Sequence, residues 1–376
     1  MMRIPAIRCF VIMIAALGIV ATPTAQAPAW REAQPGYTFA FPRDHASHPD
    51  YRVEWWYYTG NLDAADGRRF GYQVTFFRVG IDPAPENPSR WAVRDIYMTH
   101  VAIGDPSGRR YRAAERINRA GPGIAGAATD RYHVWNDDWS ASRDTDGRHT
   151  IHVVAADLGV DLQIDEGRPP TINGSDGISR KGNEQGNASH YYSLTRMPTR
   201  GTIALDDEEI AVTGESWMDR EFGTSFLEAD QVGWDWLALQ LSDGRDLMIY
   251  QLRRRAGSAD VHSSGTLTDA DGQVRHLSSS DFSLTPTGTT YRSPTSGATY
   301  PIGWRVEVPR EAIALTVSTP LPAQELDFSR TTGVAYWEGL VDVHGTGRNG
   351  ATIGGRGFLE MTGYAGSLGR FLSTPR

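Results

Sequence analysis

Asp-Gly pairs occur throughout this chain and constrain its fold more than any other feature. There are five, beginning at positions 66, 146, 176, 243 and 271, and most lie between runs rich in Val, Ile, Tyr, Trp and Thr. Tight β-hairpin turns favour Asp-Gly because their central residues adopt a positive φ. No stretch longer than two turns keeps a helical period. The pattern therefore predicts an all-β protein of antiparallel strands.

The β-rich runs fall into two series, and each is long enough to close a barrel of about eight strands. The first series covers residues 54–62, 70–79, 95–103, 135–141, 150–156, 191–196 and 202–205. The second begins near residue 215 and covers 235–241, 246–253, 265–268, 303–308, 313–317, 335–343 and 357–362. We therefore predict two antiparallel β-barrels in tandem, with short helices only. Their predicted domains are 28–210 and 211–376.

The N-terminus has the pattern of a secretory signal peptide. Two arginines precede an apolar run over residues 10–20, and small residues follow it. The run has about eleven residues, whereas a membrane-spanning helix needs about twenty. We therefore predict a signal peptide over 1–27 and export to the periplasm or cell envelope. Cleavage after Ala27 is the first expectation, with Ala21 and Ala29 as alternatives.

Cysteine content and net charge limit the kinds of molecule that this chain can bind. The single cysteine, Cys9, lies within the predicted signal peptide, so the mature chain contains no cysteine. Removing the two arginines of residues 1–27 takes the formal net charge from −8 to −10. A chain with this charge is a poor partner for nucleic acid or for an anionic membrane surface. We therefore expect no nucleic-acid partner.

The segment 214–253 places acids and tryptophans in predicted strands. Side chains alternate along a strand, so Trp234 and Trp236 share one face and Asp235 lies on the other. Three tryptophans within twenty residues are more than one small core uses without pairing their indole N–H groups. We therefore expect a lined cavity, with ligand-binding side chains at Trp217, Trp234, Trp236 and Tyr250.

The run from Glu54 to Gly60 offers a second set of candidate residues. Trp56 and Tyr58 share a face with Glu54, and Trp55 and Tyr57 share the opposite face. One interpretation is that these rings plug the base of a barrel. The other is that Glu54, Trp56 and Tyr58 line a cavity for a flat or polyene-like apolar ligand. A carboxyl among aromatic rings would have a raised pKa and could act as a general acid.

Three acids are the candidate catalytic residues: Asp219, Glu221 and Asp235. Asp219 and Glu221 flank Arg220, which is compatible with a salt bridge that positions a turn or with a proton-transfer pair held by an arginine. Asp235 lies between two tryptophans, which oppose its exposure. The loop-like segment 167–189, with two adjacent cations, fits either a cavity rim or a plain surface loop.

Motifs for metals and cofactors are missing from the sequence. His45, His48 and Asp50 are close together but lie in a proline-flanked loop, and there is no His-Glu-x-x-His pair or cysteine ligand set. A phosphate loop, a dinucleotide fingerprint and a Gly-x-Ser-x-Gly elbow are also missing. We therefore expect neither a metal nor a cofactor.

Several segments together resemble the AttH/CrtC family, and they span nearly all of the predicted mature chain. They include HPDYRVEWWYYTGNL and GESWMDREFG, and their residues are 48–62, 98–105, 177–203, 214–223, 233–253, 300–309, 336–345 and 355–364. The resemblance implies two lipocalin-like barrels. The family includes secreted proteins associated with ABC-type exporters, more distant carotenoid 1,2-hydratases, and related fungal cofactor-free cyclases.

The resemblance leaves two functions open. The first is an exported protein that binds an apolar, isoprenoid-like or lipid-like molecule, with components of an ABC-type exporter as possible partners. The alternative is a cofactor-free lyase (hydratase) or isomerase that uses a cavity carboxylate as general acid. The chain departs from the hydratase relatives at Arg220, Phe222 and Leu252, where they carry a histidine, a tryptophan and an acid. These departures argue against a carotenoid substrate.

Overall fold

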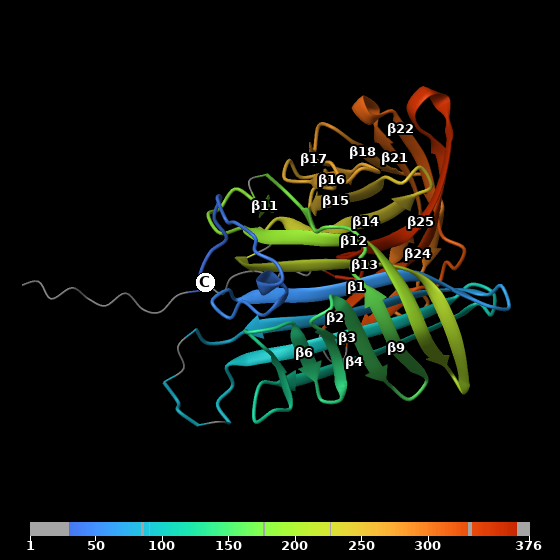
Figure 1. Cartoon of the computed structure of the whole chain (residues 1–376). Coiled ribbons are helices and arrows are strands. Elements are labelled where there is room, and N and C mark those ends of the chain that lie inside the picture. Colours follow the sequence, from blue (N-terminus) through green and yellow to red (C-terminus); the bar gives the residue numbers. More distant parts are fainter. Residues whose placement is uncertain are drawn as a thin grey trace, which may run out of the picture.

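The protein is built almost entirely of β-strands (Figure 1). The structure is a computed structural model, and it describes residues 30–83, 86–89, 91–175, 177–225, 227–329 and 333–366. Two large antiparallel sheets form the molecule, as the alternating runs predict. The predicted signal peptide, 1–27, lies outside the described residues.

The first sheet contains thirteen strands, in the path β4-β3-β2-β1-β13-β12-β9-β8-β7-β6-β5, with β10 and β11 also paired to β12. Its strands are β1 (Val53–Ala64), β2 (Arg69–Gly80), β3 (Asp95–Asp105), β4 (Arg110–Arg119), β5 (Ala125–Ala127), β6 (His133–Asn136), β7 (Trp139–Arg143), β8 (Arg148–Val154), β9 (Leu158–Asp165), β10 (Thr171–Ile172), β11 (Ser179–Arg180), β12 (Ala188–Leu205) and β13 (Glu208–Ser225).

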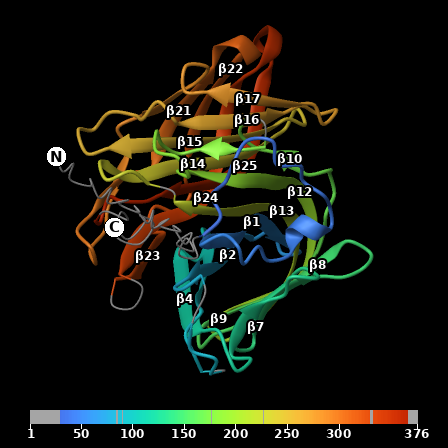
Figure 2. The same ribbon diagram turned by 90° about the vertical axis from the view of Figure 1, so that its left-hand side faces the viewer.

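This sheet curls until its two ends meet, which makes it nearly barrel-shaped (Figure 2). The amide of Asn118 on β4 donates to Asn136 Oδ1 on β6 at 2.8 Å. The amide of Asn136 in turn donates to the carbonyl of Arg116 at 3.0 Å. Side-chain hydrogen bonds thus join strands that the backbone ladder does not pair.

The second sheet contains ten strands, in the path β17-β16-β15-β14-β25-β24-β22-β21-β18, with β23 also paired to β24. Its strands are β14 (Gln231–Leu241), β15 (Asp246–Arg254), β16 (Ser264–Thr268), β17 (Val274–Ser278), β18 (Ser283–Pro286), β21 (Gly303–Val308), β22 (Ile313–Ser318), β23 (Glu325–Phe328), β24 (Val334–Thr346) and β25 (Thr352–Met361). A separate hairpin joins β19 (Thr290–Arg292) to β20 (Thr299–Pro301).

Turns and short helices connect the strands. Gly67, Gly147, Gly244 and Gly272 follow the aspartates of four Asp-Gly pairs and have φ between +84° and +88°. Each lies between two paired strands, which confirms the hairpins predicted there. The helices of the described residues are three 3-10 turns: η1 (Arg43–His45), η2 (Pro309–Glu311) and η3 (Arg348–Gly350). In the described part of the chain, no helix has the length and apolar character to cross a bilayer.

The three largest of five apolar clusters among the described residues stabilise this arrangement. Trp56 and Tyr58 belong to the core inside the first sheet, and Trp304 belongs to the core inside the second. A third cluster, which includes Tyr57 and Trp236, lies between the two sheets. Burying one such aromatic ring contributes about 1.5–3 kcal/mol. The third cluster therefore holds the two sheets together.

In chain order, β13 is the last strand of the first sheet and β14 is the first strand of the second. β13 pairs with β1 and β12 along its length, and β14 pairs with β15 and β25. The predicted domain boundary, between 210 and 211, therefore falls inside β13. The chain passes from one sheet to the other between Ser225 and Gln231.

Candidate functional site

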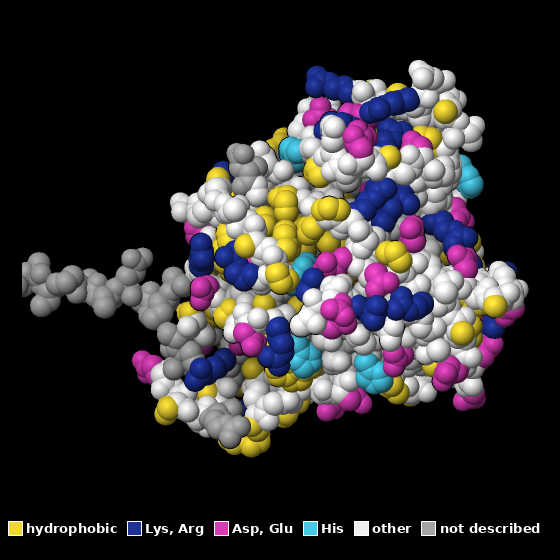
Figure 3. Space-filling model, in the orientation of Figure 1, with side chains coloured by type: hydrophobic (Ala, Val, Ile, Leu, Met, Phe, Trp, Pro, Cys, Tyr) yellow, Lys and Arg dark blue, Asp and Glu magenta, His cyan; other side chains and the backbone are white. Residues whose placement is uncertain are grey.

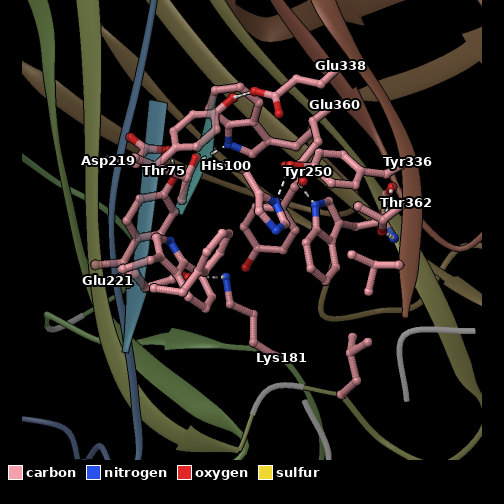
Figure 4. Close-up of a pocket in the computed structure, with 18 of the residues that line it drawn as sticks. Thr75, His100, Lys181, Asp219, Glu221, Tyr250, Tyr336, Glu338, Glu360 and Thr362 are labelled. Atoms are coloured by element: carbon pink, nitrogen blue, oxygen red, sulfur yellow. Dashed lines mark hydrogen bonds and ion pairs between the residues drawn. The ribbon is translucent and has the colours of Figure 1, made fainter. Parts of the chain in front are cut away.

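An apolar cavity of about 140 Å³ lies between the two sheets rather than inside either of them. Hydrophobic side chains gather around a hollow near the middle of this face of the molecule (Figure 3). Aromatic rings and buried acids line it, and Figure 4 shows how they converge. The lining residues are Trp55, Tyr57, Thr75, Phe77, Met98, His100, Lys181, Tyr191, Asp219, Glu221, Leu227, Trp234, Trp236, Tyr250, Leu252, Val334, Tyr336, Glu338, Glu360 and Thr362.

Strand register builds the wall contributed by the first sheet. On β1 and β13, Trp55 pairs with Glu221 and Tyr57 pairs with Asp219. Paired residues point to the same face of a sheet, so all four side chains face the cavity. On the other side of β13, the paired strand β12 places Tyr191 beside Glu221.

The second sheet supplies the opposite wall. Trp236 on β14 pairs with Tyr250 on β15 and with Glu360 on β25. Glu360 is also the direct partner of Glu338 on β24. The register therefore places the two carboxyl groups side by side, with Glu360 next to Trp236.

Asp219 is a buried carboxyl held by three donors. Ser193 Oγ and Trp217 Nε1 donate to its Oδ1 at 2.5 and 2.6 Å, and the Tyr191 hydroxyl donates to its Oδ2. These donors favour the carboxylate, but burial favours the neutral acid more strongly. Burial therefore raises the pKa of Asp219 to about 7, and the nearby charge of Glu221 adds to the rise.

Glu221 shares its region of the cavity with Lys181. The Lys181 ammonium lies 3.3 Å from Glu221 Oε1 and 4.1 Å from the centre of the Tyr250 ring. Burial raises the pKa of Glu221, and the ammonium opposes that rise. Burial lowers the pKa of Lys181, but Glu221 and Tyr250 together more than offset this, so its pKa is raised. Lys181 belongs to the segment 167–189, for which the sequence allowed either a cavity rim or a plain surface loop.

Glu338 and Glu360 form a carboxyl pair at the other end of the cavity (Figure 4). The Tyr57 hydroxyl donates to Glu338 Oε1 at 2.6 Å, and Trp234 Nε1 donates to Glu360 Oε2 at 3.1 Å. Burial raises the pKa of Glu360 to about 7. Burial, with the charge of Glu360, raises the pKa of Glu338 well above its usual value. Two like charges this close disfavour double ionisation.

His100 faces the cavity as a neutral group. Its Nδ1 lies 2.8 Å from the Tyr336 hydroxyl, and burial lowers its pKa to about 3. The imidazole therefore offers hydrogen bonding without charge at neutral pH.

The structure brings together most of the residues predicted from the segment 214–253. Trp234, Trp236, Tyr250, Asp219 and Glu221 all line the cavity. The predicted Trp217 lies just behind them, in the apolar cluster between the sheets, where its indole donates to Asp219. The stretch around Asp219 is the interior of β13, not a turn as the salt-bridge interpretation supposed.

The predicted Glu54, Trp56 and Tyr58 lie outside this cavity, on the opposite face of β1. Trp56 and Tyr58 are fully buried in the core of the first sheet, as the plug interpretation holds. Glu54 contacts two guanidinium groups, with Arg78 Nε at 2.5 Å and Arg220 as the second. These two charges lower the pKa of Glu54 despite its burial, so the expectation of a raised pKa is wrong.

Asp235 also faces away from the cavity. It lies 3.1 Å from Arg253 Nε and accepts a hydrogen bond from the Tyr364 hydroxyl at 2.9 Å. Burial raises its pKa to about 6, with Arg253 opposing the rise. Alternation along β14 separates it from its neighbours Trp234 and Trp236, as the sequence predicts.

Sequence reasoning missed half of the acidic site. Glu338 follows Tyr336 and Trp337, and Glu360 follows Phe358 and Leu359, so each is an acid directly after large apolar residues, and this is the signal that could have identified them. Trp55 and Tyr57 line the cavity, whereas the sequence-based prediction places ligand contacts on the opposite face of β1, at Trp56 and Tyr58. Among the described residues, no group of three or more His, Cys, Asp or Glu side chains is placed to hold a metal ion.

Comparisons with known proteins agree with this architecture. The AttH-like family model matches residues 32–364. A candidate AttH from Nitrosomonas europaea is 34% identical, with a TM-score of 0.80 over 89% of this chain and 99% of its own. Kievitone hydratase from Nectria haematococca is 14% identical, with a TM-score of 0.69 over 91% and 97% of the two chains. CghA with Sch210972 is 13% identical, with a TM-score of 0.52 over 91% and 97%. No curated protein matches the chain.

Proposed function

The chain belongs to the AttH-like family, and on that premise we propose that it is a cofactor-free enzyme acting on an apolar, unsaturated small molecule. The reaction is acid catalysis, either hydration or isomerisation of a carbon–carbon double bond. The observation that carries the proposal is Asp219, a buried carboxyl with a pKa raised to about 7 that faces a cavity of aromatic rings. A group with this pKa can both give and take a proton at neutral pH.

The proposed step begins when neutral Asp219 transfers its proton to one alkene carbon. The π-electron pair forms the new C–H bond, and the other carbon becomes a carbocation. The faces of Trp55, Tyr57 and Trp236 line the space where this charge develops. Water then adds to the cation and gives a proton to the carboxylate, which completes a hydration. Loss of a neighbouring C–H proton to the same carboxylate gives an isomer instead.

Two further observations support this function. The cavity suits an apolar ligand, because its lining is mostly aromatic or aliphatic. The exceptions include the four acids, Lys181 and His100. One protein that shares the fold is named a hydratase, although at 14% identity the likeness concerns the fold alone. Binding of an apolar molecule without chemistry is the competing function, and the same cavity would serve it.

The test is turnover in isotopically labelled water. Wild-type protein is incubated with prenylated phenols and linear isoprenoid alcohols in H₂¹⁸O or D₂O, and products are analysed by mass spectrometry. We expect ¹⁸O incorporation for hydration, or deuterium alone for isomerisation. Asp219→Asn should lower the rate by about 10²–10⁴-fold, the range for losing a general acid. Asp271→Asn, in an exposed turn, is the control. Equal rates in Asp219→Asn and wild type would refute the role of Asp219.

We also propose that the mature protein works outside the cytoplasm, because two arginines and an apolar run over 10–20 form the pattern of a cleaved leader. N-terminal sequencing of protein from the cell envelope should find a new terminus near Ala27. A terminus at Met1 or Met2 would contradict this. Contact with an ABC-type exporter remains a prediction from the family resemblance.

A further inference from the structure

The cavity lining contains more acidic than basic side chains. Four carboxyl groups line it, and Lys181 is the only Lys or Arg among the lining residues that the structure describes. Lys181 pairs with Glu221 at one end. The other end contains Glu338 and Glu360, whose strands place them side by side.

Lys181 shows how this cavity accommodates an ammonium group. Its Nζ lies 3.3 Å from a carboxylate oxygen of Glu221. It also lies 4.1 Å from the centre of the Tyr250 ring and 5.2 Å from that of Tyr191. A carboxylate with aromatic faces is the combination that stabilises organic cations in a desolvated site.

The Glu338–Glu360 end contains the same combination without a Lys or Arg among the described lining residues. Trp234 and Tyr57 donate to the two carboxyls, and Trp236 and Tyr336 supply further rings to the lining. The titratable groups around this pair are neutral or acidic. Asp219 and Glu221 from β13 act on Glu360, the pair acts on the hydroxyls of Tyr57 and Tyr336, and Glu338 acts on that of Tyr111. Glu115 and Glu325 act on Tyr336 and Tyr111, respectively, and the neutral His100 contacts Tyr336. The local potential is therefore negative whenever a carboxyl ionises.

We propose that the Glu338–Glu360 end of the cavity binds the ammonium group of an apolar organic amine. The inference rests on the proposed function only in placing the ligand in the same cavity. An arriving cation would stabilise the ionised form of one carboxyl and displace its proton. Affinity for a permanent cation should therefore rise as the pH increases through about 7, the pKa of Glu360.

A matched pair of probes tests this charge preference. Benzyltrimethylammonium and neopentylbenzene have nearly the same shape, and only the first carries a charge. Isothermal titration calorimetry with the full-length protein should show the ammonium binding about tenfold more tightly at pH 8, a difference of about 1.4 kcal/mol. This preference should shrink several-fold at pH 6. Equal affinities at pH 8, or no binding of either probe, would overturn the proposal.

Variants then locate the preference. The double variant Glu338→Gln/Glu360→Gln should bind neopentylbenzene as wild type does but lose the preference for the ammonium, and intact binding of the neutral probe shows that the fold is kept. Glu184→Gln, on the exposed part of the rim segment, should change neither affinity. An unchanged preference in the double variant would overturn the assignment.

Failure of the cation site can be distinguished from failure of the proposed enzyme activity. Asp219→Asn removes the proposed proton donor and should retain most of the ammonium preference. Lost turnover with retained preference supports both proposals. Retained preference without turnover in the wild type leaves a cation-binding protein and refutes the enzyme. Wild-type turnover without any charge preference refutes the cation site alone.

Discussion

At the residue scale, the buried acids of this protein fall into two groups, one with lowered and one with raised pKa values. Glu54 lies between Arg78 and Arg220, and their charges lower its pKa. Glu338 and Glu360 have no such partner among the described lining residues, and burial raises the pKa of both. Paired acids stabilise a fold, whereas unpaired ones reduce its stability once they ionise. The second kind is the one expected at a functional site.

Glu360→Gln should stabilise the protein at alkaline pH. The folded state binds an extra proton between the usual glutamate pKa of about 4.5 and the raised value of about 7, so wild-type stability falls as the pH rises through that window. The variant avoids the cost of ionisation, at most about 3 kcal/mol at pH 8, and should match wild type near pH 4.5. Thermal unfolding at several pH values measures this. Identical pH profiles for both proteins would contradict it.

Glu54→Gln should have the opposite effect. The lowered pKa of Glu54 gives stability that is present above about pH 4.5 and is lost as the pH falls through the folded-state value. At pH 7 the variant leaves Arg78 and Arg220 uncompensated, which should cost about 3–5 kcal/mol. Urea unfolding at pH 7 and pH 3 should show that the difference shrinks in acid. A variant as stable as wild type at pH 7 would disprove the pairing.

At the element scale, β14 shows how one strand serves two purposes. Its Trp234 and Trp236 face the cavity between the sheets, while Asp235 faces Arg253 and Tyr364. Because side chains alternate, a substitution at one position tests one face without touching the other. Stability and ligand binding should therefore respond to different residues of the same strand.

Asp235→Asn should leave ligand binding unchanged and should not destabilise the protein at pH 7. Burial raises the pKa of Asp235 to about 6 although Arg253 opposes the rise, so ionisation of Asp235 reduces stability as the pH rises from about 4 through 6, and the neutral Asn avoids that cost. Trp236→Ala is the matched variant on the other face, and it should alter the binding of neopentylbenzene. Thermal unfolding and calorimetry separate the two effects. Altered probe binding in Asp235→Asn would place Asp235 in the site.

At the scale of the whole molecule, the site exists only because the two sheets stack. The Tyr57 hydroxyl on the first sheet donates to Glu338 on the second at 2.6 Å, and Arg69 pairs with Asp342 across the same junction. The apolar cluster between the sheets packs around these polar contacts. The cavity is therefore a property of the junction between the sheets.

Cutting the chain between the sheets should not separate them. A protease site inserted between Glu228 and Gln231, cleaved after folding, leaves the junction intact because every member of the third cluster, Leu227 included, lies outside the inserted site. The two fragments should co-elute in size-exclusion chromatography and keep the benzyltrimethylammonium affinity. Fragments that separate without denaturant would show that the junction is weaker than its packing indicates.

The all-β class, the hairpin turns at four Asp-Gly pairs and the side chains that share a strand face could all be predicted from the sequence, because turn chemistry and strand alternation are local. The packing of the two sheets decided which face of β1 meets the cavity, since Trp55 and Tyr57 are as aromatic as Trp56 and Tyr58 on the other side. It also decided that Glu338 and Glu360, more than twenty residues apart in sequence, form one site with Asp219. The stacking of the two sheets arises from packing between residues far apart in the chain, which local sequence patterns do not encode.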